Sequence, residues 1–103
     1  MTMTIDPATG RLKQEAVAAL PDSMAYVSLD PTGGLLFTAS YGGNKIAVLL
    51  IGRNGQVTAQ AQQVIETGRN AHAIVSDRTG KYVFVTNLGS DAVQQFKLDP
   101  ETG

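Results

Sequence analysis

The sequence has no cysteine and no tryptophan, and it carries a single histidine among its 103 residues. Without cysteine the chain has neither a disulfide framework nor a thiolate metal site, and a reducing compartment is favoured. With one histidine, no pair of imidazoles has metal-ligand spacing. We therefore expect a cytoplasmic protein without a bound metal.

Charge of one sign and long apolar runs are also missing. The net charge is −1, and the eight lysines and arginines are scattered, so a nucleic-acid partner is not expected. The longest apolar run, residues 46–51, is far too short to span a membrane. Residues 1–10 are polar and do not resemble a secretory signal. No membrane partner is expected either.

What the sequence does contain is a repeat. The segment 28–48 returns at 75–95 with the same internal spacing. A repeat of this length that is built from short strands is typical of β-propeller blades. The sequence therefore predicts an all-β fold of antiparallel four-stranded propeller blades, about two of them. The matched pairs are Asp30/Asp77, Thr32/Thr79, Gly33/Gly80, Phe37/Phe84, Thr38/Val85, Gly42/Gly89 and Ile46/Val93.

Runs of β-branched and aromatic residues, separated by turn residues, define the strands of each copy. In the tetrapeptides 30–33 and 77–80, Asp-x-Thr-Gly, we expect the aspartate side chain to cap the turn and the glycine to take a positive φ. The short connections favour antiparallel pairing. Strands are predicted at 25–29, 35–40, 45–51, 71–76, 81–87 and 92–98.

Two further segments, 11–20 and 56–65, have the alanine, glutamine and glutamate content of helices. Val57, Ala59 and Ala61 instead alternate with polar residues, as in a half-solvated strand, and both segments follow a turn that contains glycine. We interpret both segments as polar outer strands.

One two-blade unit, residues 1–103, follows from these strands: an outer strand at 11–20, a first blade at 25–65 and a second blade at 71–98 that lacks its outer strand. Residues 99–103 nearly copy residues 6–10, so the chain ends where the next outer strand would begin. A bare edge strand invites aggregation. We expect a homo-oligomer in which segment 11–20 of a second molecule completes the edge.

The most specific motifs are Tyr-Gly-Gly-Asn at 41–44, and His72 followed by Asn-Leu-Gly-x-Asp at 87–91. Together with 19–23, 29–33 and 77–86, they resemble the lactonase family of seven-bladed β-propellers. That family includes the propeller form of 6-phosphogluconolactonase and the fungal carboxymuconate cycloisomerases. The resemblance covers nearly the whole chain but only about two of seven blades.

This resemblance implies hydrolysis of a sugar-phosphate lactone, 6-phosphoglucono-1,5-lactone, in the pentose phosphate pathway, with no metal or organic cofactor. Two alternatives stay open. The chain could be a non-catalytic propeller fragment that self-assembles as a scaffold. It could also belong to a cycloisomerase of the carboxymuconate type, which would need several arginines for the substrate carboxylates.

In a propeller, the loop that enters the innermost strand and the loop between the two middle strands open on the same rim. His72 should therefore lie near 87–91 and near 41–44 of the neighbouring blade. Its imidazole could act as a general base on a water that attacks the lactone, or could polarise the carbonyl. Arg69, in the same loop, is the candidate for the phosphate, with Lys45 as an alternative.

Five other residues of these loops are candidates for substrate contact. Tyrosine and asparagine can bind sugar hydroxyls, although asparagine and aspartate in such loops more often satisfy turn backbone. Asp91 could also orient the His72 imidazole. The five are Tyr41, Asn44, Asn70, Asn87 and Asp91.

Overall fold

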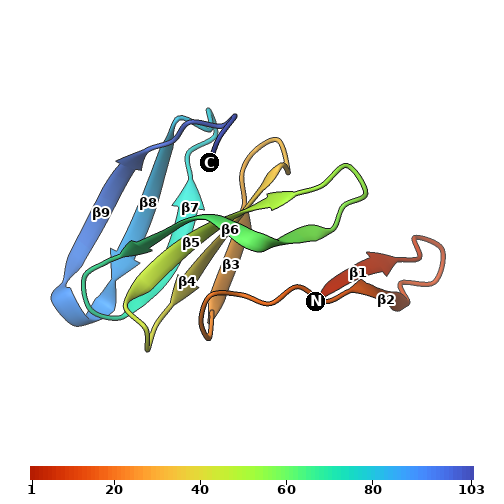
Figure 1. Cartoon of the computed structure of the whole chain (residues 1–103), viewed down its shortest axis with the longest axis horizontal. Coiled ribbons are helices and arrows are strands. Elements are labelled where there is room, and N and C mark those ends of the chain that lie inside the picture. The colour runs from red at the N-terminus through yellow and green to blue at the C-terminus, as the bar shows by residue number, and fades with distance from the viewer.

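The computed structural model describes residues 1–103, which form three antiparallel sheets. Figure 1 shows two larger sheets side by side and a small hairpin at the far end of the molecule. No helix of the chain is long and apolar enough to cross a membrane. The expected all-β fold of antiparallel propeller blades is confirmed.

The first blade contains the four strands that were predicted, paired in chain order. The strand at its outer edge is extended over ten residues, so the interpretation of this segment as a strand rather than a helix is correct. The strands are β3 (Tyr26–Leu29), β4 (Leu35–Ser40), β5 (Lys45–Ile51) and β6 (Val57–Glu66).

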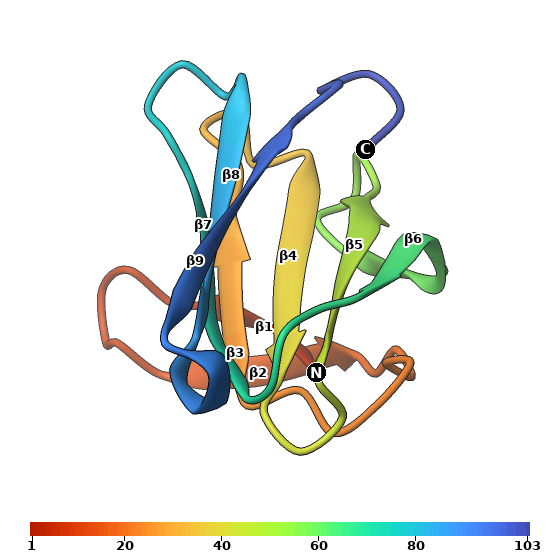
Figure 2. The same cartoon turned by 90° about the vertical axis from the view of Figure 1, so that its left-hand side faces the viewer.

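The second blade has three strands and no outer strand. They are β7 (Ala71–Ser76), β8 (Tyr82–Asn87) and β9 (Ala92–Lys97), and a 3-10 turn, η1 (Leu88–Ser90), joins the last two. β9 pairs with β8 on one side only, and Figure 2 shows it at the edge of its sheet.

The N-terminal segment differs from the prediction. The outer strand expected over 11–20 is formed only at β2 (Leu12–Ala16). It pairs with an additional strand, β1 (Thr2–Ile5), in a hairpin. β1 pairs over its four residues, and β2 ends at Ala16, opposite Thr2. Pro21 follows soon afterwards and also disfavours a longer strand.

The two blades pack face to face through their apolar side chains. Successive residues of a strand point to opposite faces, so one residue can be buried between the blades while the next is exposed. Ile74 has no exposed surface, whereas the side chain of Val75 is 42% exposed. The Ser28 hydroxyl also donates a hydrogen bond to the Ile74 carbonyl, which ties β3 to β7. The buried cluster comprises Leu35, Phe37, Ala39, Ile46, Val48, Ala71, Ile74, Val83 and Val85.

The two Asp-x-Thr-Gly turns have the predicted form. In the first, Asp30 Oδ1 accepts a hydrogen bond from the Leu35 amide at 2.7 Å, and Gly33 has φ 73°. In the second, Asp77 Oδ1 accepts from the amides of Lys81 and Tyr82, each at 3.0 Å. Each aspartate thus satisfies backbone donors at the start of the strand that follows the turn.

These hydrogen bonds favour the ionised carboxylates. The pKa of Asp77 is lowered to about 2; the hydrogen bond from the Thr79 hydroxyl has the largest effect, and the one from the Tyr82 amide comes next. The pKa of Asp30 is also lowered: burial pushes it upward, but hydrogen bonds from Thr32, Leu35 and Gly34 outweigh this.

Because the pKa of Asp77 in the folded protein lies below the ordinary value of 3.8, its contribution to stability is present above pH 3.8 and is lost as the pH falls towards 2. In Asp77→Asn, the free energy of unfolding should therefore fall less between pH 4 and pH 2 than in the wild type. Urea titrations at several pH values measure this difference. Glu101→Gln removes an exposed carboxylate that accepts no hydrogen bond and serves as the control. If both variants reduced the fall in the free energy of unfolding between pH 4 and pH 2 by the same amount, the prediction would be contradicted.

The contrast between Ile74 and Val75 gives a test of the interface between the blades. Ile74→Ala should lower the free energy of unfolding by about 2–5 kcal/mol, since it leaves a cavity in the buried cluster. Val75→Ala, one position along on the exposed face, should change it by less than about 1 kcal/mol. Chemical denaturation followed by circular dichroism measures both values. Similar losses in the two variants would show that the blades do not pack as described.

Candidate functional site

His72 is placed by an irregularity in the pairing of β7 with β8. Ala71 pairs with Asn87 and Ala73 pairs with Thr86, so His72 is an extra residue with no partner across the ladder. Such a bulge turns a side chain away from the direction that regular pairing would give it. The His72 side chain is exposed as a result.

A hollow of about 400 Å³ adjoins His72 at the end of the second blade. Its walls come from the end of β8, the η1 turn and the start of β9, so they are the loop that was predicted to share a rim with His72. The lining residues are His72, Thr86, Asn87, Leu88, Asp91, Ala92 and Val93.

Tyr41, from the first blade, contacts His72 from the other side. The centroids of the two rings lie 6.1 Å apart and their planes are at 76°, an edge-to-face arrangement. The two rings come from different blades, so the packing of one blade on the other brings them together.

The loops around this pair are joined by hydrogen bonds. Asn44 Oδ1 accepts from the Asn70 amide at 2.8 Å, and Asn70 Nδ2 donates to the Tyr41 carbonyl at 3.2 Å. The Leu88 amide donates to the Asn70 carbonyl at 3.0 Å. Asn44 and Asn70 both have positive φ, at 53° and 56°. The Asn44 and Asn70 side chains thus form hydrogen bonds with the backbone of neighbouring loops, which is the alternative role considered above for these residues.

Asn87 lies under the hollow and is only 1% exposed. Its Nδ2 donates to the Val85 carbonyl at 3.3 Å and to Gln94 Oε1 at 3.1 Å, while its Oδ1 has no partner. Gln94 Oε1 also accepts from the Gly68 amide at 3.3 Å, and it therefore fixes the loop that leads to His72. Sequence reasoning missed Gln94, because nothing marks one glutamine on a half-exposed strand as different from its neighbours.

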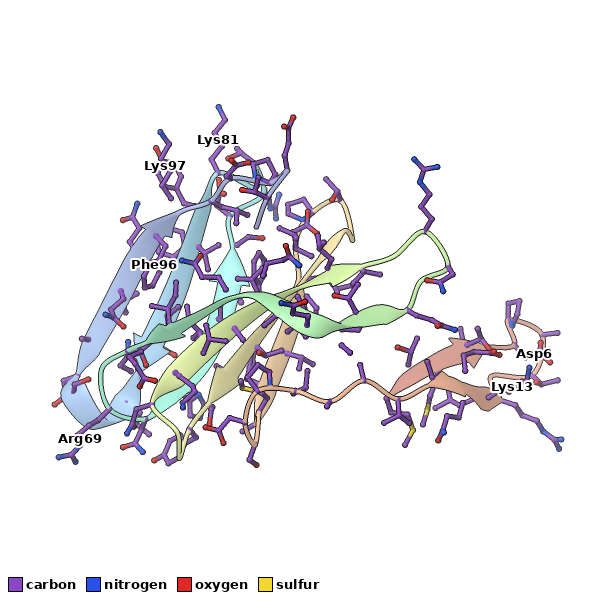
Figure 3. The ribbon with its side chains drawn as sticks, viewed as in Figure 1. Asp6, Lys13, Arg69, Lys81, Phe96 and Lys97 are labelled. Atoms are coloured by element: carbon purple, nitrogen blue, oxygen red, sulfur yellow. The ribbon has the colours of Figure 1, made fainter.

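The two charged candidates lie at the same end of the molecule. Asp91 is exposed, has φ 48° after η1, and makes no hydrogen bond to His72. Arg69 is exposed and its carbonyl accepts from the Gly89 amide at 3.0 Å. Figure 3 shows the Arg69 side chain extending outward from the end at which β9 begins.

Lys45, the other candidate for a phosphate, is already engaged. Its Nζ lies 3.5 Å from Asp22 Oδ2 and 3.6 Å from Glu66 Oε1. The structure thus brings together Tyr41, Asn44, Asn70 and His72, places Asn87 and Asp91 around the adjoining hollow, and leaves Arg69 on the rim. We name these seven residues the rim cluster.

No group of three or more histidine, aspartate or glutamate side chains is arranged to hold a metal ion. The rim cluster presents an exposed imidazole, a phenol, a carboxylate and a guanidinium.

Comparison with known proteins gives related sequences and folds. A 6-phosphogluconolactonase of Serratia proteamaculans is 40% identical over 93 residues, which are 89% of this chain and 28% of that protein. One from Xenorhabdus nematophila is 34% identical over 90 residues, 87% of this chain and 27% of that protein. The chain thus spans between a quarter and a third of the length of these relatives.

Solved structures show the same arrangement of strands. A protein from Lactobacillus plantarum matches 98% of this chain and 31% of its own length, with a TM-score of 0.86 and 26% identity. A periplasmic gluconolactonase of Pseudomonas aeruginosa matches 96% of this chain and 31% of its own, with a TM-score of 0.77 and 30% identity. The family model described as lactonase, seven-bladed β-propeller, matches residues 1–103. The chain belongs to this family of β-propeller lactonases.

Proposed function

We propose that this chain acts in the hydrolysis of a sugar-phosphate lactone, as in a 6-phosphogluconolactonase, and that the rim cluster is its contribution to the site. The observation that carries the proposal is the exposed His72, which a bulge turns out beside a hollow in a member of the lactonase family. The names of the Serratia and Xenorhabdus relatives support the substrate class. The same proposal places the reaction in the pentose phosphate pathway and the protein in the cytoplasm.

In this mechanism the neutral His72 imidazole accepts a proton from a water molecule as the water oxygen adds to the lactone carbonyl carbon. The bond between that carbon and the ring oxygen then breaks, and the proton passes to the departing oxygen. The products are a carboxylic acid and a hydroxyl group on one open chain, and the acid then releases its remaining proton to the solution and becomes a carboxylate. The edge-to-face contact with Tyr41 limits rotation of the imidazole.

Arg69 is the better of the two candidates for the phosphate. Its guanidinium makes no ion pair within the chain, whereas two carboxylates already neutralise Lys45. A guanidinium can donate two parallel hydrogen bonds to a phosphate, which positions the substrate as well as attracting it.

The rim cluster is open to solvent, since His72, Tyr41 and Asp91 are all exposed. Enzymes exclude bulk water from the reacting groups. We therefore assign the activity to a closed propeller, in which further blades cover this side, and not to two blades alone. Few guanidinium groups lie near the hollow, so the cycloisomerase alternative gains no support.

The first test replaces the candidate base. His72→Gln should lower kcat for opening of 6-phosphoglucono-1,5-lactone by about 100-fold or more, because a general base typically contributes that much. The rate is followed by acid release at constant pH, with the spontaneous rate in buffer subtracted. Gln95→Asn, on an exposed position of β9, is the control. The assay uses a closed propeller that contains this chain. If that propeller opens the lactone no faster than buffer, or if His72→Gln within it keeps its rate, the proposal is wrong.

A second test concerns the phosphate. Arg69→Gln should raise KM for the phosphorylated lactone by about 10- to 100-fold, as expected for loss of a hydrogen bond between charged groups. KM for the unphosphorylated glucono-1,5-lactone should stay the same. Arg53→Gln, an equally exposed arginine in the turn between β5 and β6, should change neither value. Equal effects of Arg69→Gln on both lactones would exclude a phosphate contact.

A further inference from the structure

The connection between the two blades, residues 67–70, leads directly to His72, and a side chain of β9 holds it. Gln94 Oε1 accepts one hydrogen bond from the Gly68 amide at 3.3 Å and a second from Asn87 Nδ2 at 3.1 Å. We name residues 67–70 the blade linker. Gln94 thus joins the linker to the last two strands of the second blade.

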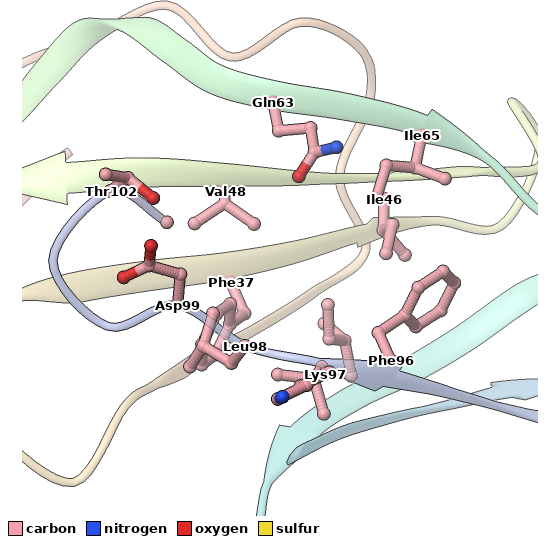
Figure 4. Close-up of a pocket in the computed structure, with 13 residues that line it drawn as sticks. Phe37, Ile46, Val48, Gln63, Ile65, Phe96, Lys97, Leu98, Asp99 and Thr102 are labelled. Carbon is pink, nitrogen blue, oxygen red and sulfur yellow. The ribbon is translucent and has the colours of Figure 1, made fainter. Parts of the chain in front are cut away.

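The direction of the Gln94 side chain follows from its place on β9. Alternate residues of a strand share a face, and Figure 4 shows Phe96, two positions further on, directed toward Ile46 and Ile65 of the first blade. Gln94 therefore faces the space between the blades, whereas Gln95 faces away from it and is exposed. The two neighbouring glutamines have the same chemistry and differ in what they contact.

The contacts of Gln94 require a hydrogen-bond acceptor. A backbone N–H can only donate, so the Gln94 atom opposite the Gly68 amide must be the oxygen. Asn87 then presents its Nδ2 to the same oxygen, and this agrees with its second hydrogen bond, from Nδ2 to the Val85 carbonyl. Because both donors meet at one oxygen, a carboxylate would serve as well as an amide. An apolar side chain would leave both donors without this partner.

The blade linker passes very close to η1, and its backbone is fixed there. A Cβ on Gly68 would collide with the Ser90 hydroxyl, so the linker approaches the turn without a side chain at this position. The Arg69 carbonyl accepts a hydrogen bond from the Gly89 amide at 3.0 Å. Gln94 adds a hydrogen bond to the residue that directly precedes Arg69, on the path to His72. A shift of the Gly68 amide would therefore be felt at the two residues proposed to meet the substrate.

We propose that Gln94 is a positioning residue of the site. By holding the Gly68 amide, it sets where Arg69 and His72 lie relative to the substrate, although it makes no contact with the substrate itself. The inference rests on the proposed function, which gives Arg69 and His72 their roles. Misplacement of reacting groups by about 1 Å can cost about 100-fold in rate, so a contact at this distance from the chemistry has a measurable effect.

The first test measures the hydrogen bond without reference to activity, by amide hydrogen exchange at Gly68 in a closed propeller that contains this chain. Gln94→Met keeps the length of the side chain and removes the acceptor. The Gly68 amide should then exchange about 3- to 10-fold faster, as expected for loss of one hydrogen bond. Gln94→Glu keeps an acceptor and should retain the wild-type rate. Gln95→Met, on the opposite face of β9, is the control.

The second test is kinetic and uses the same propeller. Gln94→Met should lower kcat for 6-phosphoglucono-1,5-lactone by about 10-fold and raise its KM by about 3- to 10-fold, because both His72 and Arg69 are displaced. KM for the unphosphorylated lactone should stay the same, and Gln94→Glu should restore both constants. A purely structural role of Gln94 would reduce the amount of folded enzyme, which lowers the apparent kcat and leaves both KM values unchanged.

The outcomes separate this inference from the proposed function. An unchanged exchange rate at Gly68 in Gln94→Met, or an equal acceleration in Gln94→Glu, would overturn the inference. So would wild-type kinetic constants in Gln94→Met, or a loss of kcat with both KM values unchanged. In each of these cases the wild-type propeller still opens the lactone. If the wild-type propeller opens it no faster than buffer, the proposed function is wrong, and this inference is wrong with it.

Discussion

The packing of β4 and β5 against β7 and β8 is the contact on which the rest of this structure depends. It buries Phe37, Ile74 and Val85 completely, and no other large set of side chains in the chain is shielded from water. A single sheet of three or four strands would leave this apolar face exposed. The rim cluster exists because this contact holds the two blades at a fixed distance. Tyr41 meets His72, and Asn44 meets Asn70, across the same boundary.

Much of the fold could be predicted because the pattern of strands and turns occurs twice in the sequence. A turn such as Asp30–Gly33 is ambiguous alone, but its recurrence as Asp77–Gly80 fixes the period and the order of strands. The additional strand β1 was missed although a signal existed. Ile5-Asp6-Pro7 matches Leu98-Asp99-Pro100, and the match extends to the strand before the turn. The end of β2 was beyond prediction, because it depends on the register in which β2 pairs with β1.

The candidate site could be predicted in part. The repeat predicts that these loops meet on one rim, because every second connection of an antiparallel sheet lies at the same end. It does not give the direction of each side chain. The exposure of His72 depends on an irregular register between β7 and β8, which arises from pairing and not from local sequence. In the same way, Asn87 is buried because it faces the first blade, and Gln94 acts only through contacts that the fold creates.

The connections at the two ends of each blade differ in character. At one end, Asp30 and Asp77 close nearly identical turns, whose carboxylates organise the strands that follow. At the other end, the corresponding loops have diverged into Tyr41–Asn44 in one blade and Leu88–Asp91 in the next. The aspartate turns that organise the strands and the rim cluster that we propose for the site therefore lie at opposite ends of the strands. A protein engineer could therefore replace the diverged loops while leaving unchanged the aspartate turns that organise the strands.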